Sequence, residues 1–175
     1  ITEIYSPVHG ALAPLAGVND SVFRRICVRF GARPVISEML SADGLVRGNM
    51  DKVAKRMLRF LPEERPIGFQ LFGSDPEMMW RATEIVCGFD PDFIDVNAGC
   101  PVKKVVGRDA GAALMKSPRL LGDIVAGMVR VSSVPVTVKI RAGWDNETAN
   151  AVEIAGVAAD NGAAAVAVHP RTRSQ

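Results

Sequence analysis

The stretch that decides the fold is Val136-Thr137-Val138-Lys139-Ile140-Arg141, in which apolar and polar side chains alternate. Successive side chains of a β-strand point to opposite faces, so the two valines and Ile140 would share one face and the polar residues the other. The apolar face suits packing under helices. A lysine on the opposite face is costly unless it meets an anionic or hydrogen-bonding group. The stretch therefore predicts a strand with one helix-covered face and one polar face.

Short apolar stretches of this kind recur along the chain, and most are separated by segments of helical periodicity. The predicted strands are Ala11–Ala13, Val35–Met39, Ile67–Leu71, Phe93–Val96, Val136–Ile140 and Ala164–Val168. Strands that alternate with helices indicate a parallel α/β sheet. The sheet could be open and doubly wound, or it could belong to a (β/α)₈ TIM barrel, which typically needs about 250 residues. Six strands would be three quarters of such a barrel.

Four helices are predicted from start signals and from the spacing of apolar residues. One covers Asp20–Phe30, two begin at Asp75-Pro76 and Ser117-Pro118, and one begins at Thr148. An aspartate or serine before a proline at the first helical position is a typical helix start. The predicted apolar stripes are Met78, Ala82, Ile85 and Val86; Leu121, Ile124, Val125 and Met128; and Val152, Ala155 and Ala159. The arginines of the first helix, Arg24, Arg25 and Arg29, are predicted to form a solvated face.

Composition sets the class of protein. The 175 residues are enough for one domain, and 48% hydrophobic with 23% charged residues exclude a disordered chain. The net charge of +2 neither demands nor excludes a nucleic-acid partner. No apolar run is long enough for a membrane helix, and we recognise no signal peptide, so a cytoplasmic protein is expected. Three cysteines without a CxxC or Cys/His cluster argue against a disulfide framework or a metal site.

Each of five predicted strands carries one polar residue near its carboxyl end. These residues are Glu38, Gln70, Asn97, Lys139 and His169. In a parallel barrel the carboxyl ends form the mouth that holds the active site. Any one of these residues alone could be an ordinary buried group bonded to backbone, but the repetition over five strands favours a functional site.

Cys100 lies in the loop that leaves the fourth predicted strand, within Asn97-Ala98-Gly99-Cys100-Pro101. An unperturbed thiol has a pKa of about 8.5, so it is mostly protonated at neutral pH. It can donate a proton, or act as a nucleophile if an adjacent base lowers its pKa. No histidine is near Cys100 in the sequence, which favours the acid role. Cys27 and Cys87 are predicted to be core thiols in helices.

Taken together, these segments resemble the tRNA-dihydrouridine synthases, flavin enzymes that reduce uridine in tRNA, and the bacterial branch in particular. The similar segments run nearly from end to end of the chain. They are Ala13-Pro14-Leu15-Ala16-Gly17-Val18-Asn19-Asp20, Ser37-Glu38-Met39, Gln70-Leu71-Phe72-Gly73, Ile94–Pro101, Lys139-Ile140-Arg141-Ala142-Gly143 and His169-Pro170-Arg171-Thr172-Arg173. The Asn-x-Gly-Cys-Pro loop together with Gln-Leu-Phe-Gly and Lys-Ile-Arg, in this order, is highly specific as a set.

The resemblance implies an FMN-binding TIM barrel followed by a small helical domain that helps to hold tRNA. It implies that FMN contacts Pro14, Leu15, Ala16, Gln70, Lys139 and His169. It also implies substrate contacts for Asn97, Arg141 and Arg171, with Cys100 as the general acid. Reduced FMN, formed with NADPH, would pass hydride to C6 of the uracil, and Cys100 would protonate C5. The target uridine would have to leave its stack.

The chain departs from the family pattern in a few places and in length. Leu15 stands where methionine is usual, Asn19 replaces a common threonine, and Pro170 follows His169 where a small residue is usual. We expect residues 1–175 to be an incomplete barrel of about six β/α units, lacking the last two strands and the helical domain. Those strands would carry the FMN phosphate site, so this stretch alone is expected to bind FMN poorly.

Two other functions stay open from the sequence. One is an FMN enzyme similar to dihydroorotate or dihydropyrimidine dehydrogenases, acting on a free pyrimidine; the Gln70–Gly73 and His169–Arg173 segments favour the tRNA enzyme. The other is an RNA-binding half-barrel without flavin, which the modest net charge supports little. Lys103, Lys104 and Arg108 follow Cys100 and form either an RNA-facing patch or a solvated loop. No DNA, membrane or obligate protein partner is indicated.

Overall fold

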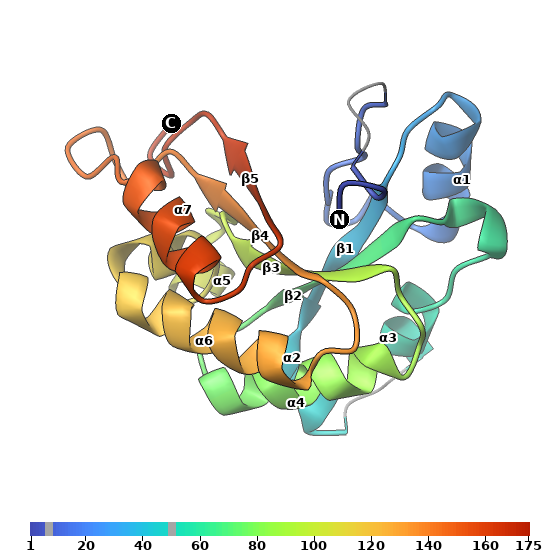
Figure 1. Cartoon of the computed structure of the whole chain (residues 1–175), viewed down its shortest axis with the longest axis horizontal. Helices are drawn as coiled ribbons and strands as arrows, with labels where there is room; N and C mark the ends of the chain where they lie inside the picture. The colour runs from blue at the N-terminus through green and yellow to red at the C-terminus, as the bar shows by residue number, and fades with distance from the viewer. Residues whose placement is uncertain (6–8, 49–51) are drawn as a thin grey trace.

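The computed structural model describes residues 1–5, 9–48 and 52–175 and contains a five-stranded parallel sheet (Figure 1). The strands are β1 (Val35–Ser41), β2 (Ile67–Phe72), β3 (Phe93–Ala98), β4 (Val136–Arg141) and β5 (Ala165–His169), and they neighbour one another in chain order. The N-terminal segment lies beside β1, and the C-terminus lies beside β5 at the other edge of the sheet (Figure 1). The α/β prediction with a parallel sheet is therefore confirmed.

The first predicted strand, Ala11–Ala13, is wrong as an element of the sheet. Within this segment the structure has one isolated parallel β-bridge, between Leu12 and Val35. The Leu12 N–H donates to the Pro34 carbonyl at 2.9 Å, but Pro14 has no N–H with which to continue the ladder. The chain instead turns into a loop, so the five later strands make up the described sheet.

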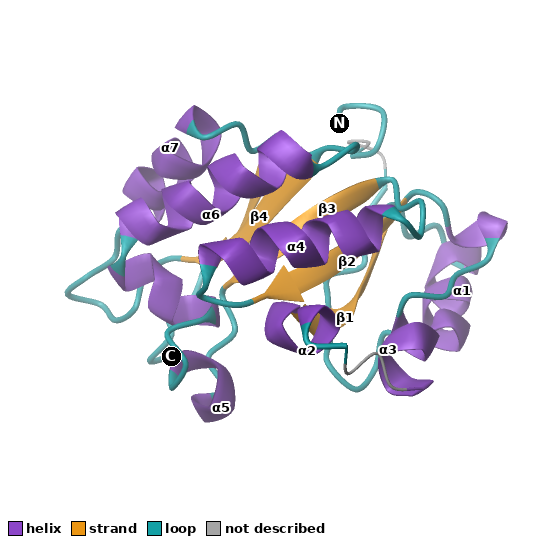
Figure 2. Cartoon of the chain, turned by 90° about the horizontal axis from the view of Figure 1, so that it is seen from below, coloured by secondary structure: helices purple, strands orange, loops and turns teal. Residues whose placement is uncertain are grey.

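Helices cover one face of this sheet. The described helices are α1 (Ser21–Arg29), α2 (Ala42–Val46), α3 (Lys52–Met57), α4 (Pro76–Cys87), α5 (Lys103–Val106), α6 (Pro118–Val131) and α7 (Ala151–Asp160), with two 3₁₀ turns at Pro62–Glu64 and Gly111–Lys116. Figure 2 shows α4, α6 and α7 side by side against the same face, while α1 lies beyond β1. On the opposite face, called the open face below, the described chain places no helix, and the Tyr5 ring packs against Phe93 there with 5.7 Å between ring centroids. In the described part of the chain, no helix is both long enough and apolar enough to cross a membrane.

Three of the predicted helix starts are confirmed. The Asp20 carboxylate caps α1 by accepting from the Phe23 N–H at 2.9 Å, and Asp75 caps α4 through the Met78 N–H at 3.2 Å. Helix α6 begins at Pro118, although Ser117 contributes its carbonyl rather than its hydroxyl. The predicted start at Thr148 is wrong. Thr148 bonds to Asp145 in a turn, and the helix begins three residues later.

The predicted buried residues are confirmed for α6, whereas in α4 and α7 partly different residues are buried. All four predicted residues of α6 are fully buried. In α4 the fully buried face is Met79, Ala82, Thr83 and Val86. In α7 the buried residues are Ile154 and Ala158, while Val152 is 90% exposed. Ile154 and Ala158 are four residues apart, so they lie on one side of α7, and this side packs against the sheet.

The solvated arginine face predicted on α1 is wrong for Arg24, which is 1% exposed. Its Nε donates to the equally buried Glu64 carboxylate at 2.7 Å, and its other nitrogens donate to the carbonyls of Asn19 and Arg59. Glu64 also accepts from the Ser21 hydroxyl at 2.6 Å. Because both charges are fully hydrogen-bonded, this buried pair fixes α1 and the loop before it against the 3₁₀ turn.

The two apolar residues of α7 should respond very differently to truncation. We expect Ile154→Ala to lower the free energy of unfolding by about 2–5 kcal/mol, because it leaves a cavity in the core. Val152→Ala on the same helix should change it by less than about 0.5 kcal/mol, because that side chain contacts solvent. Urea unfolding of the complete protein measures both, and equal losses would contradict the assigned orientation of α7.

Candidate functional site

The register of the strands arranges the open face of the sheet in rows. Gln70 of β2 lies opposite Asp95 of β3, which lies opposite Thr137 of β4. One step nearer the carboxyl ends, Asn97 lies opposite Lys139. A final pair at the edge of the sheet is Arg141 and His169. The polar residues predicted on separate strands therefore come together at the carboxyl edge.

A bulge removes Glu38 from this arrangement. Regular pairing of β1 from Ile36 onward would place Glu38 opposite Gln70, but the register shifts and Met39 takes that position. The prediction that Glu38 shares the polar face is therefore wrong, because one extra residue rotates the strand and re-aims the side chain. The Asn97 amide instead meets the Met39 sulfur at 3.6 Å.

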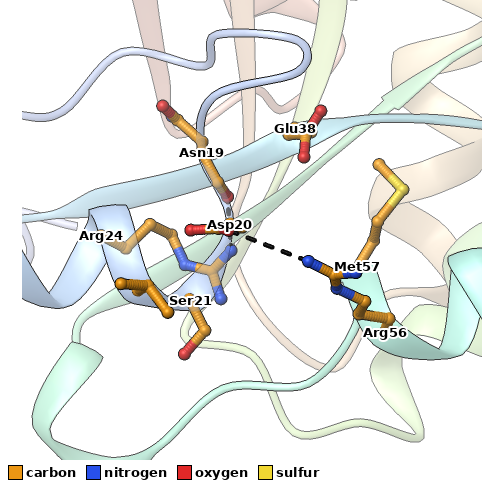
Figure 3. Close-up of a pocket in the computed structure, with 8 residues that line it drawn as sticks. Asn19, Asp20, Ser21, Arg24, Glu38, Arg56 and Met57 are labelled. Atoms are coloured by element: carbon orange, nitrogen blue, oxygen red, sulfur yellow. Dashed lines mark hydrogen bonds and ion pairs between the residues drawn. The ribbon is translucent and has the colours of Figure 1, made fainter.

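Glu38 instead lines a depression of about 360 Å³ beside α1. Asn19, Asp20 and Met57 also line this depression (Figure 3). Figure 3 shows Asp20 and Arg56 paired across it, at 3.9 Å. The Glu38 carboxylate accepts a hydrogen bond from the Gly17 N–H. This bond tethers the loop that leads from Pro14 towards α1.

Four side chains on the open face form one continuous hydrogen-bond relay. Asp95 is fully buried and accepts from the Gln70 amide nitrogen at 2.6 Å and from the Thr137 hydroxyl at 2.6 Å. The Asn97 amide nitrogen donates to the Gln70 amide oxygen at 2.8 Å. Burial raises the pKa of Asp95, and the two hydrogen bonds and the Lys139 charge counteract that shift.

The Cys100 loop is held from several sides. The Asn97 amide oxygen accepts from the Gly99 N–H at 3.2 Å and from the Cys100 N–H at 2.9 Å. The Cys100 carbonyl accepts from the Ala112 N–H at 3.0 Å. Gly111 has a φ of +60°, and a Cβ there would approach the Cys100 carbonyl oxygen to 2.7 Å. Only glycine therefore fits beneath this loop.

The Pro14–Ala16 segment is fixed by the buried side chain of Asn19, which sequence analysis noted only as a departure from the family pattern. Asn19 is fully buried, and its amide nitrogen donates to the Ala13 and Ile36 carbonyls at 2.8 Å each. The Leu15 carbonyl accepts from the backbone N–H groups of Val18 and Asn19. These bonds hold the loop across the carboxyl ends of β1 and β2.

Together these loops and strand ends enclose a cavity of about 330 Å³. Nine of the ten residues that the family resemblance assigned to FMN, substrate or catalysis line it: Pro14, Leu15, Ala16, Gln70, Asn97, Cys100, Lys139, Arg141 and His169. Arg171 does not line it; its side chain is exposed on the loop after β5. Cys27 and Cys87 lie on α1 and α4, half-buried and away from this cavity.

Two basic side chains of the cavity, Lys139 and His169, have pKa values lowered by their surroundings. Burial lowers the pKa of Lys139, with Arg141 adding to the shift and Asp95 opposing it. Partial desolvation and the nearby charges of Arg141, Lys139 and Arg171 lower the pKa of His169. The His169 Nδ1 accepts from the Arg171 N–H at 3.1 Å, so the neutral ring carries its proton on Nε2. The cavity thus favours a ligand with anionic or carbonyl groups.

Arg141 joins two loops of the cavity. Its Nε donates to the Gly99 carbonyl at 2.6 Å, and one terminal nitrogen donates to the Thr172 carbonyl at 2.9 Å. The loop that carries Cys100 and the loop that follows His169 are thereby fixed relative to each other. Sequence analysis assigned Arg141 to substrate contact and did not reveal this structural task, because the acceptors are backbone carbonyls of distant loops.

The fold and the cavity define a parallel α/β protein whose site is built at the carboxyl ends of its strands around one thiol and several cations. Residues 11–175 match the family model described as "Dihydrouridine synthase (Dus)". The chain therefore belongs to the dihydrouridine synthase family.

Individual relatives agree with the family match. The chain is 46% identical to the tRNA-dihydrouridine synthase B of Shewanella oneidensis over 162 residues, which cover 93% of this chain and 50% of the relative. It is 42% identical to the proteins of the same name from Pseudomonas aeruginosa and Xanthomonas campestris, of which it covers 48% and 49%. The chain thus spans about half the length of the curated relatives it matches.

The Arg141 bridge predicts a stability effect. Arg141→Lys should lower the free energy of unfolding by about 1–3 kcal/mol, because a single ammonium cannot reach both carbonyls with the geometry of the guanidinium fork. Arg119→Lys is the matched control, since Arg119 is exposed on α6, and should change stability by less than about 0.5 kcal/mol. Urea unfolding of the complete protein would count against the bridge if both variants behaved alike.

Proposed function

We propose that the complete protein containing this chain is an FMN-dependent tRNA-dihydrouridine synthase, which reduces the C5–C6 bond of uridine in tRNA and takes its electrons from NADPH. The observation that carries the proposal is the position of Cys100 on the rim of a cavity that also contains Lys139, Asn97 and His169. The family membership and the names of the relatives support it.

The residues of the cavity fit a flavin. Its walls combine the apolar Pro14–Ala16 loop with the donors of Gln70, Lys139 and His169, and a flavin ring offers apolar faces and carbonyl oxygens to match. The incompletely neutralised ammonium of Lys139 would gain from a ligand carbonyl or a negative charge. Pro14, Leu15, Ala16, Gln70, Lys139 and His169 are thus the proposed FMN contacts.

With a flavin in this cavity, the side chains around it would each have a defined role in the reduction of uridine. A bound, reduced flavin supplies the hydride for C6 of the uracil. Cys100 holds a proton on Sγ and delivers it to C5, and the resulting thiolate regains a proton from solvent. Lys139 stabilises negative charge that develops on carbonyl oxygens, and Asn97 fixes the loop that carries the thiol. Arg141 and Arg171 are proposed to contact the substrate.

The described sheet is proposed to be part of a (β/α)₈ barrel. Its strands are all parallel and in chain order, and the Leu12 bridge extends them beyond β1. Val168 on the edge strand β5 is 52% exposed, as expected of a residue that further elements cover. We propose that the segment around Leu12 takes the place of the first strand, and that two more strands, with an FMN phosphate site, and a helical tRNA-binding domain complete the eight-stranded barrel and the protein. Residues 1–175 alone would then bind FMN poorly.

The surface next to Cys100 supports tRNA as the substrate. Lys103, Lys104 and Arg108 are exposed on α5 and the turn after it, directly beyond the Cys100 loop. Cations in this place could bind phosphates on either side of a uridine that enters the cavity. A tRNA substrate is consistent with the expected cytoplasmic location. The family match weighs against the free-pyrimidine dehydrogenase, which remains the second candidate.

The acid role of Cys100 predicts a selective defect. In Cys100→Ala, dihydrouridine formation should fall by about 10²–10⁴-fold, because no group replaces the proton donor, while flavin reduction by NADPH stays at the wild-type rate. Cys87→Ala, which removes a thiol from α4, serves as the control and should keep full turnover. Dihydrouridine is measured by mass spectrometry of digested tRNA, and normal turnover in Cys100→Ala would refute the assignment.

Flavin binding should depend on pH through Lys139. Because its pKa is lowered from 10.5, the ammonium loses its proton earlier than a solvated lysine as pH rises, and FMN affinity should fall over that range. Lys139→Arg keeps its charge and should remove this part of the pH dependence, although its affinity at neutral pH can differ. Fluorescence titrations of the complete apoprotein compare the two. Identical pH profiles would mean that the Lys139 charge does not contribute.

A further inference from the structure

We propose that Asp95 is a positioning residue for the thiol: its buried carboxylate fixes the direction of the amide relay through Gln70 and Asn97 that holds the backbone of Gly99 and Cys100. This inference deepens the proposed function and rests on it, since the loop so held carries the proton donor. Asp95 itself lines no part of the cavity and would touch neither flavin nor uracil. It would act only through the relay.

The loop end of the relay shows which way the two amides must point if the backbone of Gly99 and Cys100 is to be held. The N–H groups of Gly99 and Cys100 can only donate, so the group facing them must be the Asn97 oxygen. The Asn97 nitrogen is then left to donate to the Gln70 oxygen at 2.8 Å. That turns the Gln70 nitrogen away from the loop and towards position 95, where it needs an acceptor.

The other end of the relay demands the same direction. An ionised carboxylate only accepts, and the two Asp95 oxygens accept separately from Gln70 and from Thr137, at 2.6 Å each. Both ends of the relay therefore require the same donor-to-acceptor direction, from Asn97 through Gln70 to Asp95. If Gln70 turned over, two oxygens would face each other at Asp95.

Retaining a carboxylate at this place is costly, which supports a specific role. Asp95 is 2% exposed, and burial raises its pKa despite its two hydrogen bonds. The titratable groups around it are Lys139 on the neighbouring strand, whose charge opposes that shift, and Tyr5, which stays neutral because burial raises its pKa. A neutral side chain would spare the desolvation, but it would not impose a single direction on Gln70.

A reversal of the relay tests the proposal. Asn97→Asp keeps an acceptor for the loop but forces Gln70 to turn its nitrogen towards position 97 and its oxygen towards the Asp95 carboxylate. Adding Asp95→Asn supplies a donor for that oxygen and still accepts from Thr137. The pair thus reverses the inner part of the relay at constant net charge and satisfies every group again.

Hydrogen exchange of the peptide containing Gly99 and Cys100 measures the loop directly, in the complete flavin-free protein. We expect Asn97→Asp to speed exchange about tenfold, because the new carboxylate at position 97 faces the Gln70 oxygen, or the turned Gln70 oxygen faces Asp95, and this repulsion draws the acceptor away from the loop. Asp95→Asn alone should do much less, since its oxygen can still accept from Gln70. The double variant should return to within about threefold of the wild type, a coupling that independent sites do not show.

A control separates the relay from general loosening of the core. Thr137→Val removes the other donor to Asp95 and should leave exchange at Gly99 and Cys100 unchanged. The proposal is overturned if Thr137→Val speeds exchange as Asn97→Asp does, or if the double variant exchanges as fast as Asn97→Asp or fails to fold. Flavin reoxidation by tRNA, measured on the wild-type protein, tests the enzyme function separately, because the exchange experiment needs neither flavin nor tRNA.

Discussion

The parallel pairing of β1 to β5 is the constraint on which the rest of the site depends. It brings the carboxyl ends of all five strands to one edge, and the register then decides which side chains meet there. Gln70 reaches Asp95, and Asn97 lies beside Lys139, only because the strands are aligned without a shift between β2 and β4. The register shift in β1 places Met39 instead of Glu38 opposite Gln70 and so keeps the Glu38 carboxylate out of the cavity.

Buried polar groups turn this sheet into a site by fixing the loops above it. Arg24 and Glu64 secure the start of α1, and Asn19 secures the Pro14–Ala16 loop that faces the cavity. On the other side, the Asp95 relay holds the Cys100 loop. Each of these groups is costly to bury alone, and hydrogen bonds to the backbone or to a partner side chain offset that cost. The outcome is that the two loops that line the cavity, one of which carries Cys100, are held in place by hydrogen bonds.

Much of this was predictable from local patterns, and the rest required contacts between distant segments. Strand alternation placed Gln70, Asn97 and Lys139 on one face, and proline after a capping residue placed the starts of α4 and α6. The bulge in β1 leaves no local signal, because the register between two strands creates it. Arg24 is buried because it pairs with Glu64, forty residues away in the chain. The sequence of the helix alone therefore predicted a solvated arginine face. Asp95 was hidden for the same reason: its partners lie on two other strands.

The most direct test of the account is anaerobic reoxidation of the flavin in the complete protein. The protein is loaded with FMN, reduced with NADPH and mixed either with tRNA that lacks dihydrouridine or with a free pyrimidine. The account predicts rapid reoxidation by the tRNA and little by the free base, since the exposed cations beside the Cys100 loop would bind phosphates. Reoxidation by the free pyrimidine without any response to tRNA would contradict it and would identify a pyrimidine dehydrogenase instead.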